Sequence, residues 1–240
     1  MAKSKYEYVK QFEKNDSLLP NTWLVVRIDG RNRFSERHQF AKPNDQSALD
    51  LMNKCAATII NDIQDIVLAY GQSDEYRKIV STIVSLFTSS YVFYWKDYFP
   101  MKELLYPPSF DGRVVLYPAD NNLRDYLSWR QADCHINNLY NTCFWTLVQS
   151  GKTKSEAENV LKGTVSSEKN ELLFSQFNIN YNHLPEMYRK GSVIIRREID
   201  VQITNQKGVE IMRKKNVVIT LHDDIIGDKF WKENPKLRLA

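Results

Sequence analysis

Cysteine is scarce in this sequence: only three of the 240 residues are cysteines, Cys55, Cys134 and Cys143. Their number is odd and their spacing is not that of a metal-binding motif. The pattern is therefore neither that of a disulfide-bonded secreted domain nor that of a zinc-binding domain. All three lie in segments with helical periodicity. They are predicted to be reduced thiols in the hydrophobic core.

Long apolar runs are absent as well. No segment approaches the roughly 20 apolar residues that a membrane-spanning helix requires. Residues 1–8 also lack the apolar stretch of a secretory signal peptide. We therefore expect the protein inside the cell, in the cytoplasm, with the nucleus left open as a second compartment, and we expect no membrane partner.

A strong excess of one charge is missing too. The chain has 33 Lys and Arg residues against 29 Asp and Glu residues, a net charge of +4, and 42% of its residues are hydrophobic. This composition excludes a disordered chain, and the length suits one large domain or two small ones. The small excess is only a weak indication of a polyanionic partner. Its distribution says more, because five basic residues surround one acidic turn: Arg27, Arg31, Arg33, Arg37 and Lys42.

Two acidic turns are the most informative feature of the sequence. Asp29-Gly30 follows the apolar run 23–28, and Ser73-Asp74-Glu75 follows the run 65–72. Both runs have the β-branched and aromatic composition of buried strands. A helical pattern that starts at residues 43–45 separates them, which gives the order strand, helix, strand. Neighbouring strands would bring Asp29 and Asp74 together.

Two adjacent carboxylates repel each other unless a cation lies between them. Carboxylate oxygens suit Mg²⁺, and a pair of such ions assists phosphoryl transfer. Gly30 fits this scheme, because a glycine lets the backbone approach a metal or a triphosphate closely. The alternative is that Asp29 and Asp74 are ordinary turn residues, since Asp-Gly is a common turn dipeptide. The residue pattern leaves both interpretations open.

The remaining periodicities predict an α+β fold. A helix over 79–99 and a strand over 113–117, entered through an Asp111-Gly112 turn, complete a helix-backed sheet of ferredoxin-like type. Residues 1–119 are therefore predicted to form the catalytic region. Residues 120–240 are predicted to be mainly helical and packed on it as one compact unit. Their expected elements are helices over 122–149, 156–161, 168–177 and 224–231, a loop over 178–182 and a strand over 192–201.

Four runs of residues resemble the eukaryotic tRNA-histidine guanylyltransferases. They are 27–32 (RIDGRN), 40–45 (FAKPND), 69–76 (AYGQSDEY) and 135–142 (HINNLYNT). The similarity covers almost the whole chain, including 3–8 and 224–228. The resemblance implies a palm like that of conventional polymerases, working in the 3′-to-5′ direction. It implies addition of a guanosine to the 5′ end of tRNA-histidine with ATP, GTP and two Mg²⁺ ions, by a homotetramer whose second half binds tRNA and mediates oligomerisation.

The resemblance also implies roles for individual residues. The catalytic residues would be Asp29, Asp74 and Glu75, and the metal ligands Asp29, Gly30 and Asp74. The nucleotide-binding residues would be Arg27, Asp29, Gly30, Arg31, Asn32, Arg33, Phe34, Lys42, Ser73 and Asp74. The tRNA-binding residues would be His135, Asn138 and Lys169. Arg130 is added to them from its chemistry, because Trp129 and Arg130 together could form a stacking platform for RNA bases. From chemistry alone, Lys42 is equally a solvated loop lysine and His135 more often a structural histidine.

The sequence departs from the family pattern in two places. The family carries further residues after Asn32, and a strand with a basic loop after Tyr76, and this sequence has neither. Basic residues that the resemblance assigns to part of the 5′-triphosphate site are therefore missing. Two alternatives stay open: a template-directed polymerase that repairs tRNA 5′ ends, and a non-catalytic RNA-binding palm protein. The run 135–142 argues against the first, and the intact acidic residues argue against the second.

Overall fold

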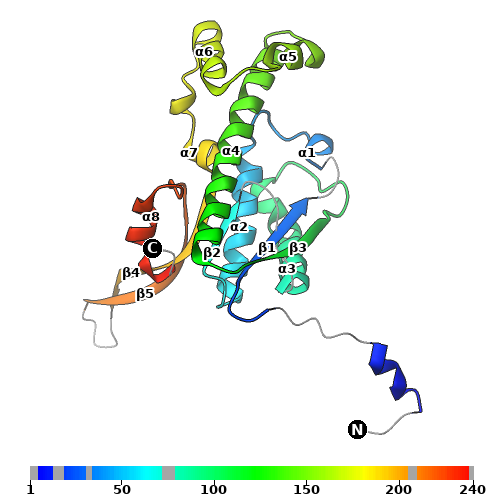
Figure 1. Cartoon of the computed structure of the whole chain (residues 1–240), viewed down its shortest axis with the longest axis vertical. Helices are drawn as coiled ribbons and strands as arrows, with labels where there is room; N and C mark the ends of the chain where they lie inside the picture. The colour runs from blue at the N-terminus through cyan, green and yellow to red at the C-terminus, as the bar shows by residue number, and fades with distance from the viewer. Residues whose placement is uncertain (1–4, 13–18, 31–33, 72–78, 205–209, 238–240) are drawn as a thin grey trace.

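The computed structural model describes residues 5–12, 19–30, 34–71, 79–204 and 210–237. Two antiparallel sheets lie beside one long helix, α4 (Asp120–Gln149) (Figure 1). The first sheet pairs β1 (Trp23–Gly30) with β3 (Phe110–Tyr117). The second has the order β2 (Leu68–Gly71), β4 (Ser192–Thr204) and β5 (Glu210–Leu221). The mixed helix and sheet fold is the class that the sequence predicts.

The arrangement of the strands differs from the prediction. The runs 23–28 and 65–72 were expected to be neighbours, yet within the described residues β1 pairs with β3, and β2 pairs with β4. The single ferredoxin-like sheet is therefore not seen, because each of the two strands finds its antiparallel partner far along the chain. Residues 111 and 112, expected in a turn, lie inside β3. Asp74 falls outside the described residues, so its approach to Asp29 stays a prediction.

Three helices support the first half of the chain. They are α1 (Phe34–Arg37), α2 (Gln46–Asp62) and α3 (Ile79–Tyr98). The carboxylate of Asp45 accepts a hydrogen bond from the backbone of Ala48 at 3.1 Å, which starts α2 where the sequence predicts it. The core that α2 and α3 share with β1 is almost entirely apolar and consists of Ile28, Leu51, Cys55, Ile59, Ile83, Phe87, Tyr91, Trp95 and Phe99.

The second half surrounds α4. Its elements are α5 (Lys154–Leu161), α6 (Ser166–Phe177), η2 (Tyr181–His183), α7 (Glu186–Lys190), α8 (Asp228–Glu233) and η3 (Pro235–Leu237), while η1 (Glu7–Phe12) lies apart near the N-terminus. Thr153 and Glu156 cap α5 reciprocally. At the start of α6, whose first residue is Ser166, the carboxylate of Glu168 accepts a hydrogen bond from the backbone of Val165 at 2.7 Å.

Gln131 connects α4 by hydrogen bonds to the segment before β4 and to the segment before α8. The side-chain amide of Gln131 donates to the carbonyls of Lys190 and Asp223, each at 2.9 Å. Its oxygen accepts from the backbone of Ile225 at 2.8 Å. Gln131 is only 4% exposed, so three buried backbone groups are satisfied by one side chain. The same amide therefore fixes the start of β4 and the segment that leads to α8 against α4.

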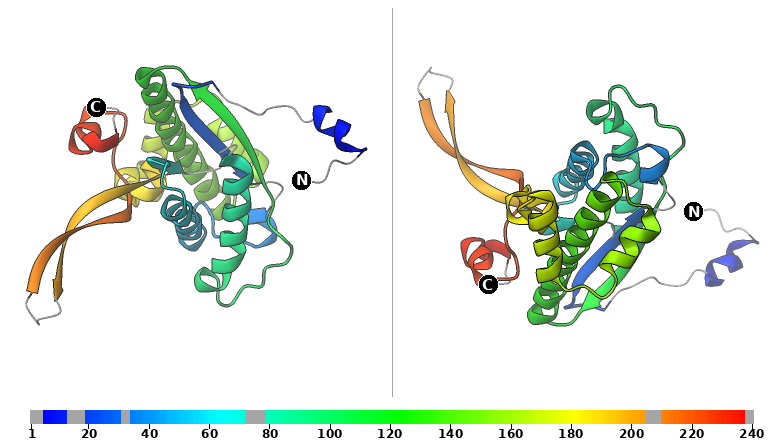
Figure 2. Two further views of the ribbon diagram at one scale, coloured as in Figure 1. Left: turned by 90° about the horizontal axis from the view of Figure 1, so that it is seen from below. Right: turned by 90° about the horizontal axis from the view of Figure 1, so that it is seen from above.

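The predicted division at residues 119 and 120 stays a prediction. The three-stranded sheet takes β2 from before that point and β4 and β5 from after it. Strand β5 was not predicted, because its charged residues interrupt the alternation of apolar and polar residues that is typical of a half-buried strand. The far part of the β4 and β5 hairpin projects from the body (Figure 2).

The three cysteines are free and buried, as predicted. Burial raises the pKa of Cys55 to about 12 and those of Cys134 and Cys143 to about 11. Among the described residues, no helix is both long and apolar enough to span a membrane.

Candidate functional site

Strand β1 presents two different faces. Val26 and Ile28 are 4% and 1% exposed, and Ile28 packs with α2 and α3. Trp23 and Val25 alternate with them and pack against the core at the start of α4. Because side chains alternate along a strand, Arg27 and Asp29 continue the face that looks toward α4. Arg27 is half-buried and Asp29 is exposed.

A second carboxylate lies directly opposite Asp29. The register of β1 and β3 pairs Asp29 with Asp111 and Arg27 with Arg113. Directly opposite residues of an antiparallel pair share a face, with Cβ atoms about 4.5–5.5 Å apart. Two carboxylates and two guanidinium groups therefore occupy adjacent positions on one face, where Asp29, Asp111 and Arg113 are exposed and Arg27 is half-buried. Sequence reasoning missed Asp111 and Arg113, because Asp111-Gly112 has the composition of a turn.

Helix α4 adds a third guanidinium group to this face. Partial burial lowers the pKa of Arg27, and the positive charges of Arg113 and Arg130 lower it further, while Tyr126 and Asp29 oppose them. Burial raises the pKa of Tyr126, and the same three arginines oppose that increase. Arg130 also contacts Asp133 at 3.2 Å. Arg130, a predicted tRNA contact, thus lies near enough to Arg27 and Tyr126 to influence both of their pKa values.

Phe34, the first residue of α1, packs in the aromatic core. Its ring stacks on that of His38 with the centroids 4.0 Å apart. The backbone N–H of Leu105 donates to Nε2 of His38 at 3.1 Å, so Nδ1 carries the proton and donates to the carbonyl of Phe34 at 3.0 Å. His38, which sequence reasoning did not single out, therefore joins α1 to the segment around Leu105. The predicted contact of Phe34 with nucleotide stays a prediction.

Lys42 lies beside the C-terminal end of α4. Its ammonium group is 5.9 Å from the centroid of the Trp145 ring, and the ammonium of Lys154 is 5.6 Å from the same ring. The side chain of Gln149 donates to the carbonyl of Lys42 at 3.1 Å. The structure thus gives Lys42 a packing contact in addition to its predicted role with triphosphate.

Six of the predicted site residues lie outside the described residues: Arg31, Asn32, Arg33, Ser73, Asp74 and Glu75. Their predicted roles stay predictions. Within the described ranges, no three His, Cys, Asp or Glu side chains gather closely enough to enclose a metal ion. The facing carboxylates of Asp29 and Asp111 nevertheless offer the hard oxygen donors that Mg²⁺ prefers. Such an ion usually takes its other ligands from water and phosphate.

A separate group of predicted tRNA contacts lies further along α4. The rings of His135 and Tyr181 meet edge to face at 5.3 Å, and the hydroxyl of Tyr181 donates to the carbonyl of His135 at 3.4 Å. Burial lowers the pKa of His135, and the charge of Arg189 lowers it further. His135 remains partly exposed and, when neutral, can both donate and accept hydrogen bonds.

Asn138 has a different environment from His135. It is 2% exposed, and its amide donates to the hydroxyl of Tyr181 at 3.0 Å. The buried amide thus holds the ring against which His135 packs, and the contact of Asn138 with tRNA stays a prediction. Lys169, on α6, donates to the carbonyl and hydroxyl of Thr164 at 2.7 and 2.8 Å. Its contact with tRNA stays a prediction.

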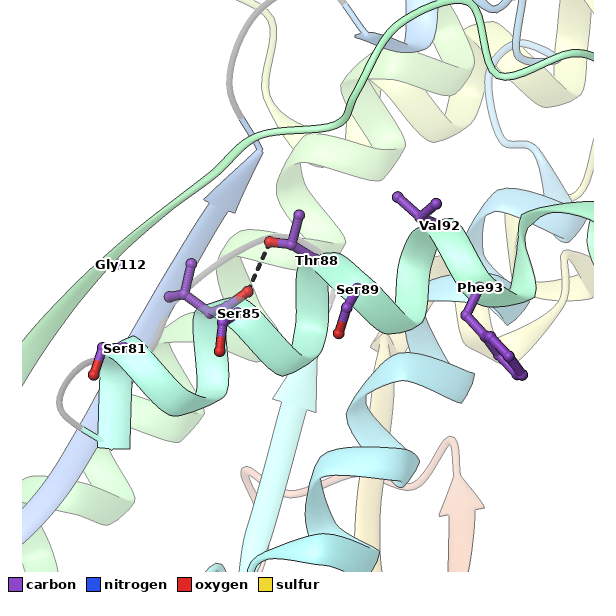
Figure 3. Close-up of a pocket in the computed structure, with 8 residues that line it drawn as sticks. Ser81, Ser85, Thr88, Ser89, Val92, Phe93 and Gly112 are labelled. Carbon is purple, nitrogen blue, oxygen red and sulfur yellow. Dashed lines mark hydrogen bonds between the residues drawn. The ribbon is translucent and has the colours of Figure 1, made fainter.

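A shallow pocket along α3 has no comparable chemistry (Figure 3). It is lined by hydroxyl and apolar groups, among them Thr88, which donates to the carbonyl of Val84 at 2.7 Å. None of its lining residues is titratable: Ser81, Val84, Ser85, Thr88, Ser89, Val92, Phe93 and Gly112. The candidate active site is therefore the face that carries Asp29 and Asp111.

Comparison with protein families shows to which family this chain belongs. The family described as tRNAHis guanylyltransferase matches residues 6–77 and 76–118, and the family described as Thg1 C terminal domain matches 121–227. The chain belongs to the tRNA(His) guanylyltransferase family. Members of this family are nucleotidyltransferases that act in tRNA processing. The first match is divided into two segments that meet at residues 76 and 77, one of the two places where the sequence departs from the family pattern.

Curated relatives in the tRNA(His) guanylyltransferase family align over nearly the whole chain. A probable tRNA(His) guanylyltransferase of Dictyostelium discoideum is 56% identical over 255 residues, covering 99% of this chain and 98% of the relative. One of Bos taurus is 54% identical over 264 residues, covering 99% and 89%. Both alignments are longer than the 240 residues of this chain. The relatives therefore contain positions that this chain lacks.

Solved structures give the same fold. The tRNA(His) guanylyltransferase of Saccharomyces cerevisiae has a TM-score of 0.76 and 42% identity, covering 87% of this chain and 96% of its own. A bacterial tRNA(His) guanylyltransferase-like protein in complex with ATP has a TM-score of 0.74 and 20% identity, covering 99% and 100%. A bacterial protein of the same description in complex with GTP has a TM-score of 0.63 and 18% identity, covering 96% and 95%.

Proposed function

We propose that the chain adds a guanosine to the 5′ end of tRNA-histidine, using ATP and GTP. The observation that carries the proposal is the full-length family match combined with the facing carboxylates Asp29 and Asp111 next to the pair of Arg27 and Arg113. The bacterial proteins of this fold that are described in complex with ATP and with GTP support the choice of nucleotides.

The proposed reaction has three phosphoryl-transfer steps. An oxygen of the tRNA 5′-monophosphate attacks the α-phosphorus of ATP, and pyrophosphate leaves. The 3′-hydroxyl of GTP then attacks the activated 5′ phosphorus, and AMP leaves. Water finally removes pyrophosphate from the new 5′-triphosphate. Each step concentrates negative charge on phosphate oxygens. Preorganised positive charges at the active site stabilise this negative charge.

The described residues would divide this work. Asp29, the Gly30 carbonyl and Asp111 would hold Mg²⁺, together with Asp74 from outside the described residues. Two bound Mg²⁺ ions would supply charge neutralisation for the attacking and leaving oxygens. Arg27, Arg113 and Arg130 would orient phosphate groups beside the carboxylates. Lys42 would contact triphosphate as a mobile point charge.

A direct assay tests the proposal. Histidine tRNA with a 5′-monophosphate is incubated with ATP, GTP and Mg²⁺, in parallel with phenylalanine tRNA and with Asp29→Ala. We expect extension by one nucleotide of the histidine tRNA alone, and its loss in the variant. Extension of both tRNAs would favour the repair polymerase. Tight tRNA binding without extension would favour a non-catalytic RNA-binding protein.

Assembly and location are part of the same proposal. One chain of 28.2 kDa is small beside a tRNA whose 5′ end and anticodon lie far apart. We propose a homotetramer in the cytoplasm, with the nucleus left open as a second compartment. A light-scattering mass of one chain would contradict the tetramer, and fractionation of cells that express a tagged chain would test the location.

A further inference from the structure

The hairpin of β4 and β5 separates its charges between two faces. Its register pairs Ile199 with Lys215, and Val201 with Arg213. Because opposite residues share a face and neighbours alternate, these side chains lie on one face. We call it the cationic face, defined by Arg197, Ile199, Val201, Arg213, Lys215 and Val217. It has three positive charges and no acidic residue.

The opposite face has a mixed charge. The register places Glu198, Asp200 and Lys214 on it. The ammonium group of Lys236 contacts the carboxylate of Glu198 at 2.8 Å and lowers the pKa of Glu198. The charge of Lys214 lowers the same pKa by a smaller amount. The electrostatic coupling of Lys214 to Glu198 agrees with the face that the register assigns to it. Acidic residues thus balance the cations on this face, whereas the cationic face has no such balance.

The cationic face is accessible along the projecting part of the hairpin. Arg213 and Lys215 are exposed, and Ile199 is 39% exposed. In the part of the chain that the structure describes, neither Arg213 nor Lys215 forms an ion pair. At the base of the hairpin, Arg197 donates to the side chain of Asn234 at 3.0 Å, next to α8. Figure 2 shows that the hairpin of β4 and β5 extends away from the body of the molecule.

We propose that the cationic face binds the sugar-phosphate backbone of the tRNA substrate. Alternate residues of a strand are about 7 Å apart, so Arg213 and Lys215 can contact successive phosphates of one RNA strand. The aliphatic side chains of Ile199 and Val201 lie opposite Lys215 and Arg213 and can pack against ribose. Three positive charges without an acidic residue on the same face favour a polyanion as the partner. Release of the counterions of the polyanion drives such binding. This inference takes tRNA as substrate from the proposed function, but assigns it a surface apart from Asp29.

Adjacent lysines on opposite faces supply a matched test. Binding of histidine tRNA is measured at several salt concentrations for Lys215→Ala, Lys214→Ala and Arg213→Ala/Lys215→Ala. For Lys215→Ala we expect a Kd about 3- to 10-fold higher and a salt slope shallower by about 0.7. The double variant should lose about twice as much of the slope. Lys214→Ala should bind within about 2-fold of the unchanged chain, because acidic residues balance it.

Three results would overturn the inference. Lys215→Ala could bind as tightly as the unchanged chain, or the two lysine variants could weaken binding equally, which would show attraction by overall charge. Alternatively, the light-scattering mass could fall in the double variant, which would make the face a contact between copies of the chain. The readout is binding, so a chain that binds tRNA in this way without adding guanosine would contradict the proposed function and leave this inference intact.

Discussion

Asp29 and Asp111 lie directly opposite each other in the antiparallel pair of β1 and β3. Like charges at opposite positions destabilise a sheet by about 0.2–1 kcal/mol. The pair is therefore not the most stable choice for a purely structural ribbon. The adjacent Arg27 and Arg113 are also opposite each other, so the same ribbon places positive charge beside the carboxylates. This arrangement suits a site that holds a cation and phosphate together.

Replacing Asp111 should weaken the response to Mg²⁺. In Asp111→Asn one carboxylate charge is lost, so we expect the Mg²⁺ concentration for half-maximal guanosine addition to rise about tenfold, which corresponds to about 1.4 kcal/mol. Saturating Mg²⁺ should restore most of the rate, whereas Asp29→Asn should not recover. Initial rates across a Mg²⁺ titration measure both effects. Asp125→Asn, an exposed change on α4, is the control. An unchanged midpoint in Asp111→Asn would remove Asp111 from the metal site.

The buried pair of Asn138 and Tyr181 should be coupled in stability. Tyr181→Phe removes the hydroxyl that accepts from the Asn138 amide at 3.0 Å. The amide would then be buried without a partner, at a cost of about 1–3 kcal/mol in the free energy of unfolding. Urea denaturation measures this loss. Tyr140→Phe is the matched control, because the Tyr140 hydroxyl has no hydrogen bond among the described residues. An equal effect of both changes would argue against the coupling.

His135 should make stability depend on pH. Its pKa in the folded chain is lowered from 6.5, mainly by burial and then by Arg189. The unfolded chain therefore binds the proton more readily. The stabilising contribution is fully present above about pH 6.5 and is lost as the pH falls through the lower folded pKa. We expect the urea midpoint to fall less steeply below pH 6.5 in His135→Gln. Identical pH profiles for the two chains would contradict the shift.

The sequence predicts most individual elements of this fold and few of their partners. Helix α4 has a long apolar stripe, and the structure places it over Asp120–Gln149, two residues earlier than expected. Strand β1 was expected over 23–28 and continues to Gly30. Local pattern could not show that β1 pairs with β3, because register depends on residues more than 80 positions away. For that reason Asp111 was interpreted as a turn residue instead of the partner of Asp29.

The site was predictable where residue type alone carries the chemistry. Asp29 was predicted from its place after an apolar strand, and the structure puts it at the exposed end of β1. The role of Asn138 was not predictable. An amide on a helix is equally suited to read RNA or to satisfy a buried group, and only the contact with Tyr181 distinguishes them. The same holds for His38, whose two hydrogen bonds join segments 67 residues apart.

Arg196 should be the residue that secures β2 to the rest of the fold. Its guanidinium group donates to the carbonyls of Gln64 at 3.0 Å, Ile66 at 2.7 Å and Ile63 at 2.9 Å, in the segment between α2 and β2. Arg196→Met keeps the aliphatic stem but removes all three charge-assisted bonds. Partial rehydration of the carbonyls would limit the loss to about 2–3 kcal/mol in the free energy of unfolding.

Hydrogen exchange of the Leu68 and Ala69 amides should accelerate as well, because β2 loses the contacts that hold the segment before it. The exposed Arg213→Met has no described partner and should unfold at the denaturant concentration of the unchanged chain. Equal midpoints for the two variants would show that the three contacts add nothing to stability.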